Sequence, residues 1–218
     1  SSTAEVLHPE IYTATPPFLA ATVNYDEVYV RETAPYADNV LGEFAIYLLL
    51  KSRVAEEEAF EAASGWLGDR YLCFPGADGV KGDHVHWRTL WQSEKDAAEF
   101  IKAAQTIWLH RYAIPWNARY EQPDGSTIVN DPTRQLRLRL GPDKKSVTLV
   151  DSPDAGWADA LEGALLVVDL GEDQVQARDA AAGDPVLAAI EDVAIALLVG
   201  ARGRVQPTVH PATASVAA

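Results

Sequence analysis

Short stretches of this chain alternate apolar and polar side chains, and this period of two is the feature that most limits how the chain folds. In the stretch 84–91, Val85, Trp87, Thr89 and Trp91 fall on one side, and the residues between them fall on the other. Successive side chains of a β-strand point to opposite faces, so a strand gathers each set on one face. We therefore predict a half-buried strand over 84–91.

A second alternating stretch lies downstream and predicts a hairpin. Leu136, Leu138 and Leu140 alternate with polar residues. The sequence Gly-Pro-Asp-Lys follows at 141–144, and an apolar stretch follows at 146–150. Turn-forming residues between two strand-like stretches are typical of a β-hairpin.

A reversal of the chain is expected ahead of these strands. Gly65, Gly68 and Asp69 permit the backbone angles that a turn requires, so we predict a turn over 65–69. The apolar residues that follow predict a strand over about 70–74.

Apolar residues at helical spacing separate the predicted strands. Ser93 and Asp96 have the spacing of a capping box, which marks the start of a helix. Helices interleaved irregularly with strands predict the α+β class, with helices packed on a mostly antiparallel sheet. The predicted helices span 41–64, 93–108, 157–166 and 184–200. The predicted organisation is an extended lead-in at 1–40, an α+β body at 41–155, a C-terminal helical segment at 156–204 and a tail at 205–218.

The charge balance is strongly acidic, and it limits the partners of the chain. There are 32 acidic and 18 basic residues, a formal net charge of -14. Such a field repels phosphate backbones and anionic lipid, which argues against nucleic-acid and membrane-surface binding. No apolar run approaches the roughly 18 residues that a membrane-spanning helix needs. The single cysteine, Cys73, lies in an apolar stretch, and we expect it to be a buried hydrophobic side chain.

Four stretches of the chain resemble one protein family. They read SSTAEVLHPEIY at 1–12, LGEF at 41–44, GWLGDRY at 65–71 and WRTLWQSEKDAAEF at 87–100. In this order and spacing they resemble bacterial and archaeal surface or lipoprotein-like relatives of zinc metallopeptidases. The resemblance implies that a zinc-binding HExxH helix lies ahead of the HPE segment, and no HExxH occurs in these 218 residues.

The resemblance thus implies a role in which other polypeptide supplies the chemistry. We expect a non-catalytic C-terminal module of a secreted protein, which supports or lines a site supplied by the upstream half of that protein. No cofactor is expected in this chain, and zinc is expected in the upstream part. The parent is expected in the extracellular or periplasmic space, attached to the surface through a segment ahead of residue 1. The alternative is an independent module that binds a protein, a peptide or a small ligand.

Two pairs of residues are candidates to face a cleft. His8 and Glu10 flank a proline that stiffens the backbone, and the resemblance places them in the HPE segment beside the upstream half. Their alternative role is local, with His8 bonding a turn and Glu10 capping it. Asp69 and Arg70 are the second pair and suggest an ion pair, whereas their alternative is a turn aspartate followed by a strand arginine.

Two histidines have the spacing of metal ligands on a strand. His84 and His86 are two residues apart and so share a face. Arg88 shares that face, and its positive charge opposes a divalent cation, so we favour solvent-facing histidines over a metal site. Core positions are expected for Trp66, Trp87 and Trp91.

Overall fold

The structure is a computed structural model. It describes residues 4–10, 20–23, 30, 33–76, 82–112, 119–121, 126–131 and 134–166. The predicted helix at 184–200 and the predicted tail at 205–218 lie outside these residues.

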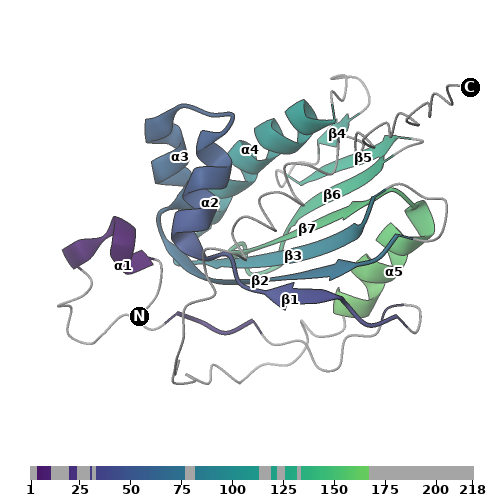
Figure 1. The fold of residues 1–218 in the computed structure, drawn as a ribbon. Helices are drawn as coiled ribbons and strands as arrows, with labels where there is room; N and C mark the ends of the chain where they lie inside the picture. Colours follow the sequence, from purple (N-terminus) through teal and green to yellow (C-terminus); the bar gives the residue numbers. More distant parts are fainter. Residues whose placement is uncertain are drawn as a thin grey trace, which may run out of the picture.

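One antiparallel sheet organises the described residues. Its seven strands lie in the order β1-β2-β3-β7-β6-β5-β4, and each strand runs antiparallel to its neighbours (Figure 1). The predicted hairpin is present as β6 and β7. The strands are β1 (Ala37–Asn39), β2 (Trp66–Phe74), β3 (His84–Trp91), β4 (Arg119–Glu121), β5 (Thr127–Asp131), β6 (Arg134–Leu140) and β7 (Ser146–Ser152).

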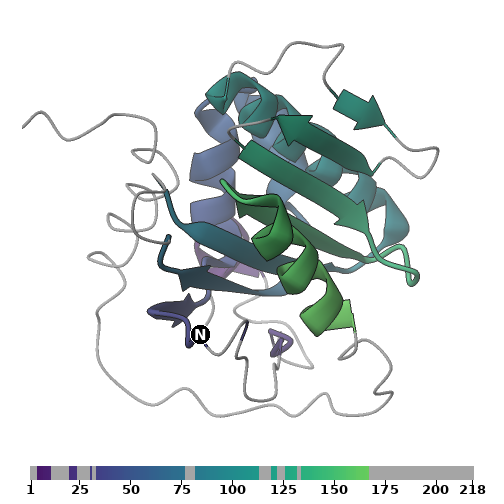
Figure 2. The same ribbon diagram turned by 90° about the vertical axis from the view of Figure 1, so that its right-hand side faces the viewer.

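Helices cover both faces of this sheet. Helices α2 (Gly42–Lys51), α3 (Glu56–Ala63) and α4 (Glu94–Arg111) lie on one face, and the short α1 (Ala4–Leu7) lies beside α2. Helix α5 (Ala155–Leu166) lies on the opposite face, as the turned view shows (Figure 2). The predicted α+β class, with helices on an antiparallel sheet, is therefore confirmed.

The chain crosses the sheet once through α4. After β3 it runs along the sheet face and enters β4 at the far edge, and the meander from β4 to β7 then returns to β3. The register of the β3 and β7 pair places Trp87 opposite Leu149. Two strands far apart in the chain therefore form the middle of the sheet.

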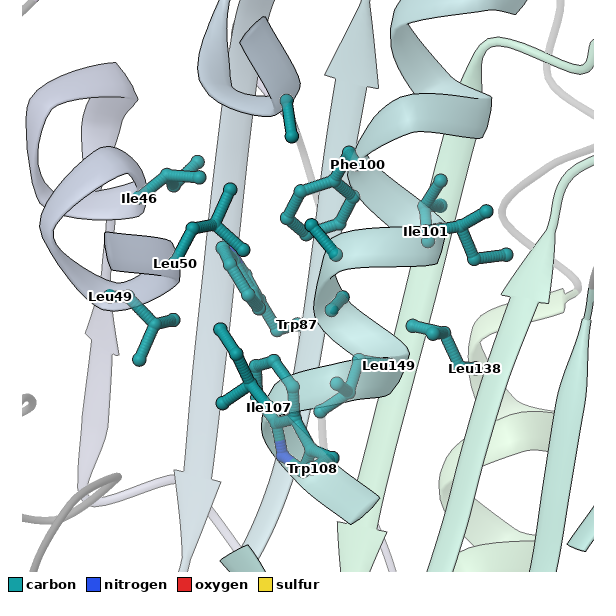
Figure 3. Packing of buried hydrophobic residues seen from close by; sticks show 14 of the residues in the cluster. Ile46, Leu49, Leu50, Trp87, Phe100, Ile101, Ile107, Trp108, Leu138 and Leu149 are labelled. Carbon is teal, nitrogen blue, oxygen red and sulfur yellow. The ribbon is translucent and has the colours of Figure 1, made fainter. Parts of the chain in front are cut away.

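The larger core lies between the sheet and helices α2 to α4. Trp87 is fully buried there, and its ring meets the ring of Phe100 edge-on at 5.5 Å (Figure 3). Trp91 stacks on the same Phe100 at 4.7 Å. Trp66 is buried in this core as well, so the core positions predicted for the three tryptophans are confirmed.

The predicted helix over 41–64 is two helices. Helix α2 ends at Lys51 and α3 begins at Glu56, and the short break allows the two helices to pack against each other. Ser52 closes α2, because its hydroxyl donates to the carbonyl of Leu49 at 2.7 Å. After the break, α3 packs on the larger core through its small residues, which are Ala59, Ala62 and Ala63.

The turn predicted at 65–69 is also wrong in its extent. Gly65 has a φ of 81° and does make a tight turn, but β2 begins at Trp66. Gly68 is a residue of β2, and glycine is needed at this position because another segment of the chain passes close to it. A Cβ on Gly68 would lie 2.2 Å from the carbonyl oxygen of Ala21, so no larger residue fits.

The predicted capping box begins α4. The amide of Asp96 donates to the Ser93 hydroxyl at 3.2 Å, and the amide of Ser93 donates to the Asp96 carboxylate at 3.0 Å. Both side chains satisfy backbone donors that the first turn of a helix leaves without partners. The helix continues to Arg111, a few residues beyond its predicted end.

This cap yields the first prediction. Ser93→Ala removes one acceptor from the start of α4 and should lower the free energy of unfolding by about 1 kcal/mol. Thr106→Ala, at an exposed position of the same helix, is the matched control and should change it by less than about 0.5 kcal/mol. Urea unfolding followed by circular dichroism measures both, and equal effects would contradict the role of the cap.

Candidate functional site

Asp69 lies at the centre of a buried hydrogen-bond cluster. One carboxylate oxygen accepts from the amide of Gly42 at 2.9 Å and from the indole of Trp66 at 3.0 Å. The other accepts from the amide of Leu41 at 2.9 Å and from the indole of Trp87 at 2.9 Å. The carboxylate therefore caps α2 from the sheet and satisfies two tryptophans at once.

This position corrects the cleft-facing role predicted for Asp69. The residue is only 1% exposed, so its carboxylate reaches no cleft. Burial raises the pKa of Asp69, and the four donors act in the opposite direction. Its function within the described residues is to join α2, β2 and β3.

Arg70 points to the other face of β2, away from Asp69. Its Nε and Nη2 atoms donate to the two carboxylate oxygens of Asp38, each at 2.6 Å, and its Nη1 donates to the carbonyl of Val23 at 3.1 Å. The suggested ion pair between Asp69 and Arg70 is therefore wrong, because neighbouring residues of a strand lie on opposite faces. Arg70 holds the edge strand β1 and a lead-in segment against β2.

His84 and His86 share a face, as predicted, but α5 and the lead-in cover that face. Each histidine is 1% exposed, so the favoured solvent-facing interpretation is wrong. The ring of His84 stacks on Trp157 of α5 at 4.3 Å, and its Nδ1 lies 2.8 Å from the hydroxyl of Ser152. Burial, followed by the charge of Arg88, lowers the pKa of His86 to about 3, so His86 is neutral at ordinary pH.

Metal ligation finds little support among the residues that the structure describes. No group of three or more histidine, cysteine, aspartate or glutamate side chains is arranged there to hold a metal ion. The described residues therefore do not fit a zinc site. A zinc site of the kind that the resemblance implies would need ligands from outside the described residues.

The HPE segment, residues 8–10, packs on α2 and α3. His8 Nε2 donates to Glu43 Oε1 at 2.7 Å, and His8 Nδ1 lies 3.4 Å from Glu10 Oε1. Glu43 is buried, which raises its pKa, and His8 opposes this shift. Glu10 itself is 72% exposed. The structure thus brings His8 and Glu10 together, as the sequence predicts, and adds a partner that the sequence did not reveal.

A second polar cluster lies where α4 ends. Asp151 is buried and accepts from Arg134 and from the hydroxyl of Tyr112, the latter at 2.5 Å. The Cζ atoms of Arg111 and Arg134 lie 5.3 and 5.2 Å from the centre of the Tyr112 ring. Arg134 also donates to the backbone carbonyl of Asp83 at 3.3 Å. This cluster ties α4 to β6, β7 and the start of β3, and Asp151 at the end of an apolar stretch was the signal that sequence analysis missed.

The thiol of Cys73 is buried, as predicted. Burial, with a smaller effect from Asp83, raises the pKa of Cys73 to about 12. A thiol with such a pKa is protonated at neutral pH, and protonated thiols are poor nucleophiles. Cys73 therefore acts here as a core side chain.

Residues 30–162 match the family described as a domain of unknown function, DUF8575. The match spans more than half of the chain, so the chain belongs to this family. No curated protein and no solved structure gives a significant match. Across the described residues, no helix combines the length and the apolar character that crossing a membrane requires.

The Asp69 cluster yields the second prediction. Asp69→Asn keeps the size of the side chain but replaces one acceptor oxygen with a donor, which then faces two of the four N–H groups. We expect the free energy of unfolding to fall by about 2–4 kcal/mol. The half-exposed partner of Arg70 provides the control, because Asp38→Asn should cost about 1 kcal/mol or less. Urea unfolding measures both, and equal costs would contradict the linking role of Asp69.

His86 yields the third prediction, a loss of stability in acid. The pKa of His86 is 6.5 when unperturbed and about 3 in the folded chain. Below about pH 6.5, His86 therefore binds a proton in the unfolded chain but stays neutral in the folded chain. From about pH 7.5 to about pH 5.5, this uptake should lower the free energy of unfolding by about 1.4 kcal/mol.

Comparing variants isolates this effect. His86→Leu should lose that part of the pH dependence, whereas His110→Leu, at an exposed position, should retain it. Urea unfolding at the two pH values measures the difference. An unchanged pH dependence in His86→Leu would show that His86 does not cause it.

Proposed function

We propose that this domain is a non-catalytic module that anchors the polypeptide ahead of it, within a secreted protein related to zinc metallopeptidases. The observation that carries the proposal is the pairing of His8 with Glu43. His8 precedes the family match, which begins at residue 30, and Glu43 lies inside the match, in the first turn of α2. A buried carboxylate of the domain is thus satisfied by a residue from upstream.

Packing adds a second contact to the same joint. Ala4 is 1% exposed and belongs to the larger core, together with Ile46 and Leu50 of α2. The upstream segment is therefore held by an apolar contact as well as by the His8 pair. A segment held in this way has a defined direction as it leaves the domain, which is what a module needs in order to support a neighbouring site.

The positions of the remaining candidates support a role without chemistry of its own. Asp69, Arg70 and His84 each join strands or helices, and His86 is buried in the fold. Glu10 is 72% exposed, and His8 beside it is partly exposed. We propose that this pair faces the upstream half of the parent protein.

Direct assays test the proposed role. The chain alone should bind less than stoichiometric zinc and should not cleave peptides, whereas a longer chain that includes the upstream half should bind zinc. Metal analysis by mass spectrometry and a fluorogenic peptide assay measure these properties. Stoichiometric zinc and peptide cleavage by the chain alone would overturn the proposal.

An independent binding module is the second candidate. It is favoured by apolar side chains that remain exposed on the helical layer, since Leu48 is 43% exposed and Phe60 is 38% exposed. Contiguous patches of exposed apolar side chains mark sites of interaction with other proteins. A protein or peptide partner would fit this surface.

The His8 and Glu43 pair yields the fourth prediction. His8→Ala leaves a buried carboxylate without its partner, and the pKa of Glu43 should rise further above 4.5. A carboxyl group with a raised pKa in the fold costs stability as the pH rises above its unfolded value. We therefore expect a loss of about 1–3 kcal/mol in the free energy of unfolding near pH 7.5 and a smaller loss near pH 4.5.

A double-mutant cycle separates this pair from other effects of the substitution. In a Glu43→Gln background, His8→Ala should cost less at the higher pH, because no charge is left unpaired and only the contact of His8 with Phe60 is lost. Limited proteolysis should also cut the lead-in faster in His8→Ala than in the natural chain. A cost independent of both pH and Glu43 would argue against an anchoring pair.

A further inference from the structure

A continuous series of aromatic rings runs along the outer side of α2 and α3. The rings of His8 and Phe60 lie 5.5 Å apart, those of Phe60 and Tyr47 lie 6.2 Å apart, and those of Tyr47 and Phe44 lie 6.4 Å apart. We call these four residues the aromatic strip. Three segments contribute to it, namely the HPE segment, α2 and α3, and Phe60 is exposed in the middle.

Acidic side chains border the strip. Glu57 lies one helical turn before Phe60 on α3 and is exposed, and Glu10 lies beside His8. Glu56 accepts from the Tyr47 hydroxyl at 3.1 Å and from Lys51 at 2.6 Å. Lys51 neutralises Glu56, while Glu57 and Glu10 add two negative charges beside the strip, so its border is negative.

The strip already holds one cation of the chain. The Nζ atom of Lys51 lies 5.4 Å from the centre of the Tyr47 ring. Aromatic faces attract cations, and the attraction is strongest for the planar guanidinium group of arginine, which also stacks on rings. Exposed rings bordered by carboxylates thus combine the two groups that recognise arginine.

We propose that the aromatic strip binds an arginine-bearing segment of a partner protein. A guanidinium group lies on the exposed ring of Phe60, and Glu57 and Glu10 pair with its charge. Apolar side chains of the same segment contact Leu48, on the outer side of α2. This surface shares His8 with the pair of His8 and Glu43 that anchors the upstream polypeptide, whereas its binding groups Phe60 and Glu57 lie outside that pair.

The charge of the chain argues against the other occupants of such a surface. A formal net charge of -14 repels a second copy of the same chain and also repels anionic lipid. A cationic partner gains from the same field, which speeds its association. The occupant is therefore expected to be a basic polypeptide.

Nuclear magnetic resonance titration of the full chain tests the proposal. The probe is a blocked hexapeptide of alternating arginine and leucine, at about 0.1 M salt so that distant charges are screened. Amide shifts should be confined to α2, α3 and the HPE segment. The same peptide with lysine in place of arginine should bind about threefold more weakly or worse, and the glutamate counterpart should not bind.

Variants separate the strip from general charge attraction. Phe60→Leu keeps an apolar side chain but removes the ring, and combined with Glu57→Gln it should weaken binding by about fivefold or more. Glu94→Gln removes one charge from an exposed position on α4 and should change binding by less than about twofold. Both variants leave the side chains of His8 and Glu43 unchanged, and because the Phe60 ring contacts the His8 ring, limited proteolysis of the lead-in checks that the anchor is retained.

Several outcomes would overturn the proposal. Shifts spread over all acidic surfaces, or equal effects of Glu57→Gln and Glu94→Gln, would indicate unspecific charge attraction. If the lysine peptide binds as tightly as the arginine peptide, the rings do not select arginine. Concentration-dependent association in sedimentation, lost in the Phe60→Leu variant, would identify a second copy of the chain as the occupant.

Discussion

A buried carboxylate links helix α2 of this domain to its sheet. Asp69 lies in β2, and its four donors come from the start of α2, from β2 itself and from β3. A buried carboxylate is costly unless its lone pairs are satisfied, and here each oxygen accepts two hydrogen bonds. The donors gain as well, because two backbone amides and two indole groups would otherwise be buried without acceptors. The position of α2 on the sheet, and of everything that packs on α2, follows from this arrangement.

The elements that sequence analysis predicted correctly depend on local rules. The strand at 84–91, the hairpin around 141–144 and the capping box of Ser93 and Asp96 involve residues close together in the chain, and the structure contains all three. The strand was expected to be half-buried, however, and it is buried on both faces. The errors arose where distant segments decide the outcome. Gly68 has the composition of a turn residue, but the approach of Ala21 explains why glycine is needed in a strand.

The candidate residues follow the same division. The sequence correctly placed His84 and His86 on one face, but a period of two cannot show that a helix some 70 residues later covers that face. His8 was recognised in its motif, whereas its partner Glu43 lies 35 residues away and carries no local signal. Asp151 stands out at the end of an apolar stretch, but its partner Tyr112 is 39 residues distant, so the cluster around it was missed. Chemistry that depends on burial and on distant partners requires the fold.

The crossover through α4 has a consequence for how the sheet assembles. The bond from Thr89 to Val147 joins residues 58 positions apart, and it lies between two strands in the middle of the sheet. Closing so long a loop costs chain entropy before any contact between those strands is gained. The two halves, β1 to β3 and β4 to β7, each consist of neighbours along the chain and are able to form early. We expect the central seam to close last, and before it closes β3 and β7 each present an unpaired edge to which another chain can add.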